Sequence, residues 1–244
     1  MYLRMKFNRF LVLLALPVAI SGCGGAGGGV SSGGSNPLAA TFRMDFTREV
    51  TPNTSLVLFV DGAGNVGAQL NDATEVEWAG KGKIVGQHIA ITLLPVGSGA
   101  SDDVFLSGNI LNGDPPTISI TLSGAVSASS TATETSGEGV TPFAGSYDGT
   151  FGGSEDGTFS LTVSEGGDVS GTLNSPSSGD NLTVLGSVDI TGKITFKYFK
   201  QTGDAHYHGY LHLSPGSESF DGKGTWSFGE MSGEWQAEQG PLTP

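Results

Sequence analysis

The fold is decided by the stretch VSEGGDVSGTL at residues 163–173. Apolar and polar residues alternate on both sides of a central Glu-Gly-Gly-Asp, and glycine in that segment supplies the positive φ angles of a tight turn. A period of two with a turn between predicts two antiparallel strands joined as a hairpin.

The same pattern extends through residues 142–244, where no sustained period of 3.6 appears. It predicts eight short strands, at residues 145–151, 157–164, 168–174, 181–188, 193–200, 206–213, 219–228 and 231–238. The fold class is therefore all-β. We expect this second domain to close into an eight-stranded up-and-down barrel, because closure removes exposed strand edges.

The first half of the chain repeats the plan. Residues 60–70 (VDGAGNVGAQL) parallel residues 163–173, and the correspondence continues at Gly82/Gly186, Ile84/Val188, Ile89/Ile194 and Gly108/Gly209. A tandem duplication explains the match, and so does the shared composition of glycine-rich hairpins. Two tandem antiparallel meander domains are the expected architecture, with one larger sandwich or barrel built from both halves as the alternative.

Between the halves, residues 127–141 (SASSTATETSGEGVT) are small, polar and unpatterned. Such a composition predicts a linker. The expected domains are then residues 38–126 and residues 142–244, each long enough to bury its own core.

The N-terminus carries an export signal. Arg4, Lys6 and Arg9 precede a short apolar run at residues 10–19, and Ile20-Ser21-Gly22-Cys23 follows. This arrangement predicts a secretory signal peptide over residues 1–22. The last four residues resemble the lipobox of bacterial lipoproteins, which implies that the Cys23 thiol receives a diacylglyceryl group and carries fatty acids such as palmitate. An ordinary cleaved signal followed by a chance cysteine is the alternative.

The segment that follows the signal peptide is expected to be a flexible tether. Residues 23–37 comprise the lipidated cysteine and the tract GGAGGGVSSGGSNP, which has almost nothing to bury. Gly24 occupies the position at which Asp resembles an inner-membrane retention signal in Gram-negative cells. We therefore expect a lipid-anchored protein of the cell envelope, at the outer membrane, on its periplasmic or surface face.

The net charge of the chain limits the classes of partner that it can bind. The chain has a formal net charge of −13, and removal of the leader with its three cations leaves −16. Nucleic acid is excluded as a partner on electrostatic grounds. The expected partners are the membrane, through the N-terminal lipid, and a protein or small-molecule ligand. Cys23 is the only cysteine, so the exported chain forms no internal disulfide.

Further motifs give the second domain a family resemblance. GSYDGTF at residues 145–151, GTFSLTV at residues 157–163, GTW at residues 224–226 and SGEW at residues 232–235 resemble strand signatures of small meander-barrel lipoproteins of bacterial envelopes. They are distantly similar to avidin-like and other calycin barrels. That resemblance implies a ligand in the barrel mouth, and it assigns no contact residues.

One strand concentrates groups that can bind a metal. Asp204, His206, His208 and His212 share one face of the expected strand at residues 206–213, because alternate residues point the same way. His206 and His208 could hold zinc or copper, with Asp204 and Asp221 as further ligands. The alternative is a solvated outer face opposite a leucine-lined core.

Other chemistry has less support in the sequence. Acidic turns, such as DGAGN at residues 61–65, do not follow the spacing of a calcium loop. No catalytic residues are assigned, since serine occurs without a nucleophile elbow. The favoured function is a non-enzymatic binding or interaction module. A metal-binding lipoprotein is second, and a hydrolase without a recognisable motif is third.

Overall fold

A computed structural model describes residues 38–46, 54–72, 75–97, 99–175, 181–200, 203–213 and 219–240. The signal peptide, Cys23 and the tether lie outside these residues. The described strands belong to one compact unit, Ser35–Pro244. Among the described residues, no helix is long and apolar enough to cross a membrane.

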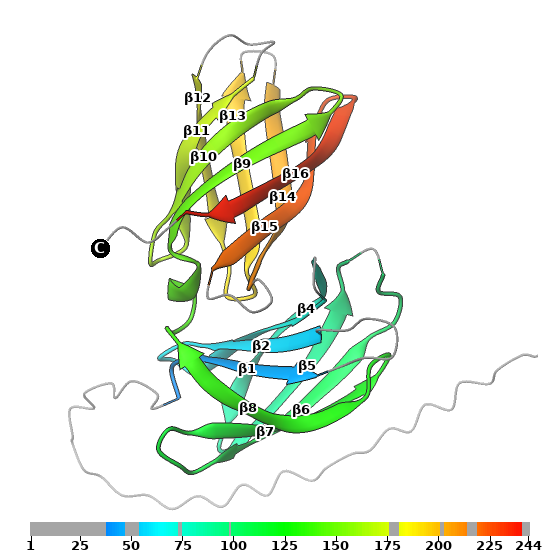
Figure 1. The fold of residues 1–244 in the computed structure, drawn as a ribbon, viewed down its shortest axis with the longest axis vertical. Helices are drawn as coiled ribbons and strands as arrows, with labels where there is room; N and C mark the ends of the chain where they lie inside the picture. The colour runs from blue at the N-terminus through cyan, green and yellow to red at the C-terminus, as the bar shows by residue number, and fades with distance from the viewer. Residues whose placement is uncertain are drawn as a thin grey trace, which may run out of the picture. The chain divides into compact units, whose positions relative to one another are not determined.

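The strands form two closed antiparallel barrels (Figure 1). The first barrel consists of β1 (Thr41–Phe46), β2 (Thr54–Val60), β3 (Asn65–Asn71), β4 (Val76–Val85), β5 (His88–Pro95), β6 (Val104–Leu111), β7 (Thr117–Gly124) and β8 (Ala128–Ser136). Each strand pairs with the next along the chain, and β8 pairs with β1 to close the barrel.

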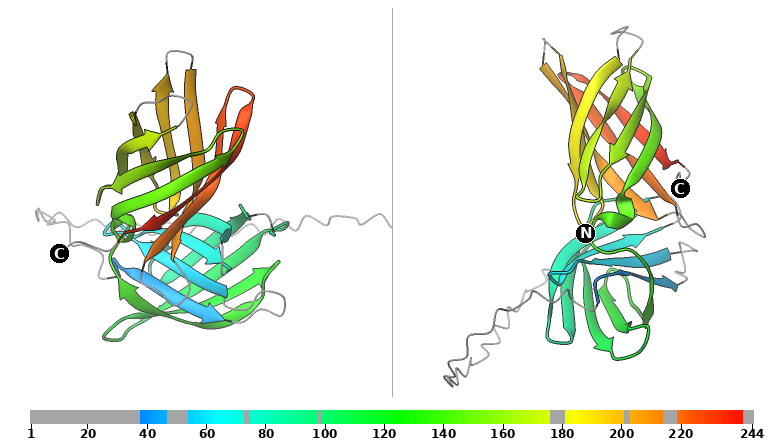
Figure 2. Two further views of the ribbon diagram at one scale, coloured as in Figure 1. Left: turned by 45° about the horizontal axis from the view of Figure 1, so that its top comes forward. Right: turned by 90° about the vertical axis from the view of Figure 1, so that its left-hand side faces the viewer.

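The second barrel has the same order. It consists of β9 (Gly145–Gly153), β10 (Gly157–Val163), β11 (Asp168–Asn174), β12 (Asn181–Val188), β13 (Lys193–Lys200), β14 (Gly203–Leu213), β15 (Phe220–Phe228) and β16 (Met231–Gln239). Strand β16 pairs with β9. Figure 2 shows from two further directions that each set of strands closes on itself.

The all-β prediction and the eight-stranded second barrel are confirmed. The alternative of one sandwich or barrel drawing on both halves is wrong, because each barrel closes with strands from its own half. The repeated residues also occupy equivalent strands. Residues 60–70 span the β2–β3 hairpin and residues 163–173 span β10–β11, with Gly64 and Gly167 at φ angles of 76° and 87° in their turns.

The predicted linker at residues 127–141 is wrong over Ala128–Ser136, which forms β8. Its outward positions include the exposed, β-branched Thr131 and Thr133, which suit a strand. Its inward positions include the fully buried Ala132 and the partly buried Ala128, which packs against the core. The strand escaped detection because small residues are enough on the inside when β7 supplies bulky residues such as Ile118 beside them.

Aromatic rings fill the second barrel. Nine aromatic side chains among the described residues of its strands are at most 5% exposed: Tyr147, Phe151, Phe159, Phe196, Tyr198, Tyr207, Phe220, Trp226 and Trp235. Phe196 stacks on Tyr207 with centroids 4.6 Å apart. Gly149 makes room for this packing, since a Cβ there would lie 2.3 Å from the Phe159 ring. Because aromatic rings fill the interior, the inward glycines contribute only their backbone to the barrel wall.

Strand β2 is buried on both faces. Leu56 and Leu58 point into the first barrel, whereas Val57 and Phe59 join the core cluster of the second. The Phe59 ring lies 4.7 Å from the Phe143 ring. Because both faces are covered, the strand is a continuous apolar run rather than an alternating one.

A buried glutamine adds polar contacts beside this shared cluster. Gln69 on β3 is fully buried, and its Nε2 donates hydrogen bonds to the carbonyls of Thr191, at 2.6 Å, and Leu211, at 2.7 Å. Two carbonyls of the second barrel are thus satisfied by one side chain of the first.

Candidate functional site

The sequence-predicted histidine pair lies on β14, on the outside of the second barrel. His206 and His208 are exposed, and their rings are nearly parallel, with an interplanar angle of 7° and centroids 6.3 Å apart. Tyr207 between them is 1% exposed and points inward. The strand alternation therefore brings these two imidazoles together on one face.

Of the other two candidate ligands, Asp204 lies near Lys197 and Asp221 lies farther along the sheet. Asp204 Oδ2 lies 3.6 Å from Lys197 Nζ. Asp221 stands opposite His212, whereas Thr225 stands opposite His208. Asp221 is thus four residues along β15 from the pair, about 13 Å at the rise of a strand. Within the described ranges, no cluster of three or more potential metal-ligating side chains occurs.

His212 differs from the other two histidines of its strand. It is only 4% exposed, and its Nδ1 has no hydrogen-bond partner among the described residues. Burial lowers the pKa of His212, and Lys223 lowers it further, while nearby carboxylates, Asp221 first among them, oppose the shift. The imidazole is therefore held neutral with one nitrogen unsatisfied.

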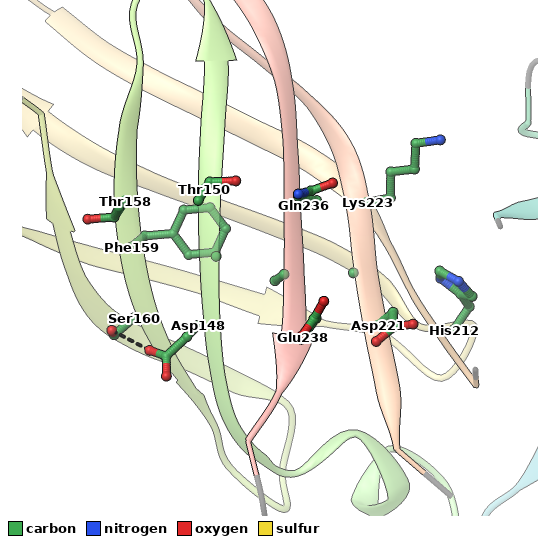
Figure 3. Close-up of a pocket in the computed structure, with 13 residues that line it drawn as sticks. Asp148, Thr150, Thr158, Phe159, Ser160, His212, Asp221, Lys223, Gln236 and Glu238 are labelled. Atoms are coloured by element: carbon green, nitrogen blue, oxygen red, sulfur yellow. Dashed lines mark hydrogen bonds between the residues drawn. The ribbon is translucent and has the colours of Figure 1, made fainter. Parts of the chain in front are cut away.

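His212 ends a row of polar side chains that crosses five strands. Ser160 on β10 pairs with Asp148 on β9, Asp148 with Glu238 on β16, Glu238 with Asp221 on β15, and Asp221 with His212. Figure 3 shows the five side chains at one level across the strands. Ser160 Oγ donates a hydrogen bond of 2.5 Å to Asp148 Oδ1.

We call Asp148, Glu238 and Asp221 the carboxylate row. Residues directly opposite each other on neighbouring strands have Cβ atoms about 4.5–5.5 Å apart, and like charges at that spacing are destabilising. The outer two members are two strand spacings apart, about 10 Å. Three adjacent carboxylates therefore form a strip of negative charge across three strands.

The carboxylate row lines a groove on the outer wall of the second barrel, with a volume of about 620 Å³. This volume falls within the range of small-molecule sites. Gly149, Gly222 and Ala237 contribute small residues to the lining between the longer side chains. Gly149 and Gly222 are inward positions, where a Cβ would meet the Phe159 ring and the Leu211 and Trp235 side chains respectively.

A second row runs parallel to the first along the groove. It consists of Thr158, Thr150, Gln236 and Lys223, again paired from strand to strand. Figure 3 shows Lys223 beyond Gln236, on the His212 side of the groove. Lys223 Nζ lies 3.7 Å from Glu75 Oε2. The groove therefore presents three carboxylates and a neutral imidazole against one ammonium group.

The acidic turn at Asp61 uses its carboxylate to hold the turn together. Oδ1 accepts hydrogen bonds from the backbone N–H groups of Ala63, at 2.9 Å, and Asn65, at 2.8 Å, and Oδ2 accepts one from Asn65 Nδ2 at 2.7 Å. These contacts explain the turn sequence without a bound ion.

Sequence reasoning missed Asp148 and Glu238 as site residues. The alternation Glu234, Gln236, Glu238 does place polar side chains on the outer face of β16. The pairing of Glu238 with Asp148, however, depends on the closure of β16 against β9. A sequence pattern gives the face of a residue, and only the register gives its neighbours.

No family model matches the chain, and a search of curated proteins also found no match.

Proposed function

We propose that this protein is a lipid-anchored lipoprotein of the bacterial cell envelope whose second barrel is a non-enzymatic binding module. The binding site is the outer groove, and the observation that supports it is the carboxylate row ending at the buried His212 Nδ1. The anchor is a lipid on Cys23, and the outer membrane is its location.

The energetics of the groove favour a ligand. Adjacent like charges on neighbouring strands are unfavourable, and a buried polar atom without a hydrogen-bond partner costs about 1–3 kcal/mol. Both features converge in one concave site. A ligand that neutralises the carboxylates and forms a hydrogen bond with the imidazole would remove both costs.

The ring-filled interior supports a site on the wall rather than in the mouth. The resemblance to calycin barrels implies a ligand in the mouth, but Phe196, Tyr207 and Trp235 pack against one another inside the second barrel. The outer groove supplies the concave surface and polar groups that the interior does not.

Two measurements test this proposal. In NMR spectra of the purified full chain, the imidazole signal of His212, assigned with His212→Gln, should shift when a panel of amines, saccharides and basic peptides is added. Glu238→Gln should weaken this shift. If no compound perturbs His212, the groove is not a binding site. For the anchor, Cys23→Ser should abolish labelling by a palmitate analogue; labelling equal to that of the parent chain would refute lipidation.

A second candidate function is metal binding by His206 and His208, favoured by their parallel, exposed rings. Two imidazoles on one strand would leave zinc or copper with open coordination positions. This site is separate from the groove along β14, so variants of the two sites distinguish the functions.

One structural observation bears on the hydrolase hypothesis. Glu238 and Asp221 are directly opposite each other, and two neighbouring carboxylates are also what a glycosidase requires. Turnover of a glycoside panel that is lost in Glu238→Gln would establish catalysis and overturn the binding proposal.

A further inference from the structure

We propose that the outer groove binds a linear polyamine, a ligand with two or more ammonium groups joined by short methylene chains. This inference rests on the proposed binding function and specifies the ligand chemistry. It is carried by the spacing of Asp148, Glu238 and Asp221 across three strands, together with the unpartnered Nδ1 of His212 beside them.

The charge geometry fits a chain of cations. Neighbouring strands lie about 4.7–4.9 Å apart, so the carboxylate row repeats its negative charge at about that interval. An ammonium group donates three hydrogen bonds and can lie between two adjacent carboxylates. A diamine or triamine lying across the strands would place successive ammonium groups along the row.

The groove also accommodates the uncharged parts of such a ligand. Gly222 and Ala237 add little side-chain bulk to the lining near the row. Both positions face the interior, so methylene groups could lie along the strand backbone there while the nitrogens face the carboxylates. The volume of about 620 Å³ leaves space for a flexible chain of this kind.

His212 offers a specific contact at one end of the row. Its Nδ1 has no hydrogen-bond partner among the described residues, and the ring lines the groove next to Asp221. Because burial keeps the imidazole neutral, Nδ1 could accept a hydrogen bond from an ammonium group once a turn of the ring brings this buried atom to the groove. Lys223 lies in the second row and would repel a cation there, which favours the position along the carboxylates.

A single metal ion fits less well. Calcium requires oxygen ligands at 2.3–2.6 Å around one centre, whereas the outer members of the carboxylate row are about 10 Å apart. Within the described part of the chain, no cluster of three or more acidic, histidine or cysteine side chains converges on one point. The charges are arranged in a line, as a linear ligand requires.

Calorimetry on the purified full chain in non-ionic detergent tests the inference, with spermidine, putrescine, n-butylamine and calcium chloride as probes. We expect saturable binding of spermidine, weaker binding of putrescine and none of n-butylamine. Asp148→Asn and Glu238→Gln should each weaken spermidine binding about tenfold, the effect of one charged hydrogen bond. His212→Leu should weaken it as well.

Glu234→Gln is the matched control, because Glu234 lies on β16 and is exposed but pairs with Thr225 and Gly152, outside the row. It removes the same charge and should change spermidine affinity less than twofold. Equal losses in Glu234→Gln and Glu238→Gln would mean general attraction to an acidic protein and overturn the inference. If calcium displaces spermidine and its binding depends on Glu238, the ligand of the groove is a metal ion and the polyamine inference is wrong.

The histidine signals separate this inference from the proposed function. If saccharides or peptides perturb His212 and spermidine does not, the groove is a binding site and the polyamine is wrong. If spermidine binds without perturbing His212 and without loss in Asp148→Asn, it binds elsewhere and the inference fails.

Discussion

Glu238 on β16 and Asp221 on β15 face each other directly, and Asp148 faces Glu238 from the opposite side on β9. Glu238 is therefore the central member of three adjacent carboxylates. Under the proposed function its position would couple stability to ligand binding, since neutralising it removes both like-charge pairs and a carboxylate that a cation would contact.

Glu238→Gln should stabilise the ligand-free protein. We expect a gain of about 0.5 kcal/mol at low salt, since solvent screens outward-facing charges, and a smaller gain at high salt. Urea unfolding at two ionic strengths measures it, with Glu234→Gln as control. A loss of stability in Glu238→Gln would mean that this carboxylate makes favourable contacts in the absence of ligand.

Stability should depend on the ionisation of His212. Because burial lowers the pKa of His212 in the folded protein, the unfolded chain binds the proton more tightly. Stability is then fully present above the unfolded pKa, near 6.5, and decreases as the pH falls toward the lower folded value. The groups facing the ring are Asp221, Asp72, Glu75 and Lys223.

His212→Gln removes this titration and should flatten the dependence of the free energy of unfolding on pH between about 7.5 and 5.5. Urea unfolding at several pH values measures the slope. The exposed His88→Gln is the control and should leave the slope as in the parent. An unchanged slope in His212→Gln would show that its proton affinity is the same in both states.

Gln69 should contribute to the stability of both barrels. Gln69→Leu leaves the carbonyls of Thr191 and Leu211 without their side-chain donor, and burial of unsatisfied carbonyls costs about 1–3 kcal/mol. Differential scanning calorimetry should show a lower melting temperature. If unfolding of the second barrel is unaffected, the two hydrogen bonds are not formed in solution.

The histidine pair gives an independent metal prediction. His206→Ala and His208→Ala should each lose most zinc or copper binding, and binding should weaken as the solution is acidified, because protons compete for the imidazole nitrogens. Calorimetry measures it, with His88→Ala as control. Equal heats in the double variant and the parent would exclude these residues as ligands.

The sequence predicted the strands of the second barrel well because turns such as the one ending at Gly167 interrupt a clear alternation of two. It failed at β8, where Ala132 is the fully buried side chain among those described and the apolar signal is weak. Small inward residues next to bulky neighbours fill a barrel without marking the strand.

The candidate site was largely beyond sequence reasoning. The outward direction of His206, His208 and His212 followed from their spacing, but the burial of His212 did not. Asp148 and Glu238 are neighbours through the closure of the barrel, ninety positions apart in the chain. Register and closure are tertiary properties that alternation leaves open.

The two-sided burial of β2 has a consequence for the order in which the chain folds. TSLVLFV, residues 54–60, carries no charge, glycine or proline and is rich in residues that favour strands. Its outward Val57 and Phe59 are covered by a cluster whose other members, from Phe143 onward, are made later in synthesis. Until those residues are made, Val57 and Phe59 of the first barrel lack their apolar partners, so the partly synthesised chain is prone to associate with other chains.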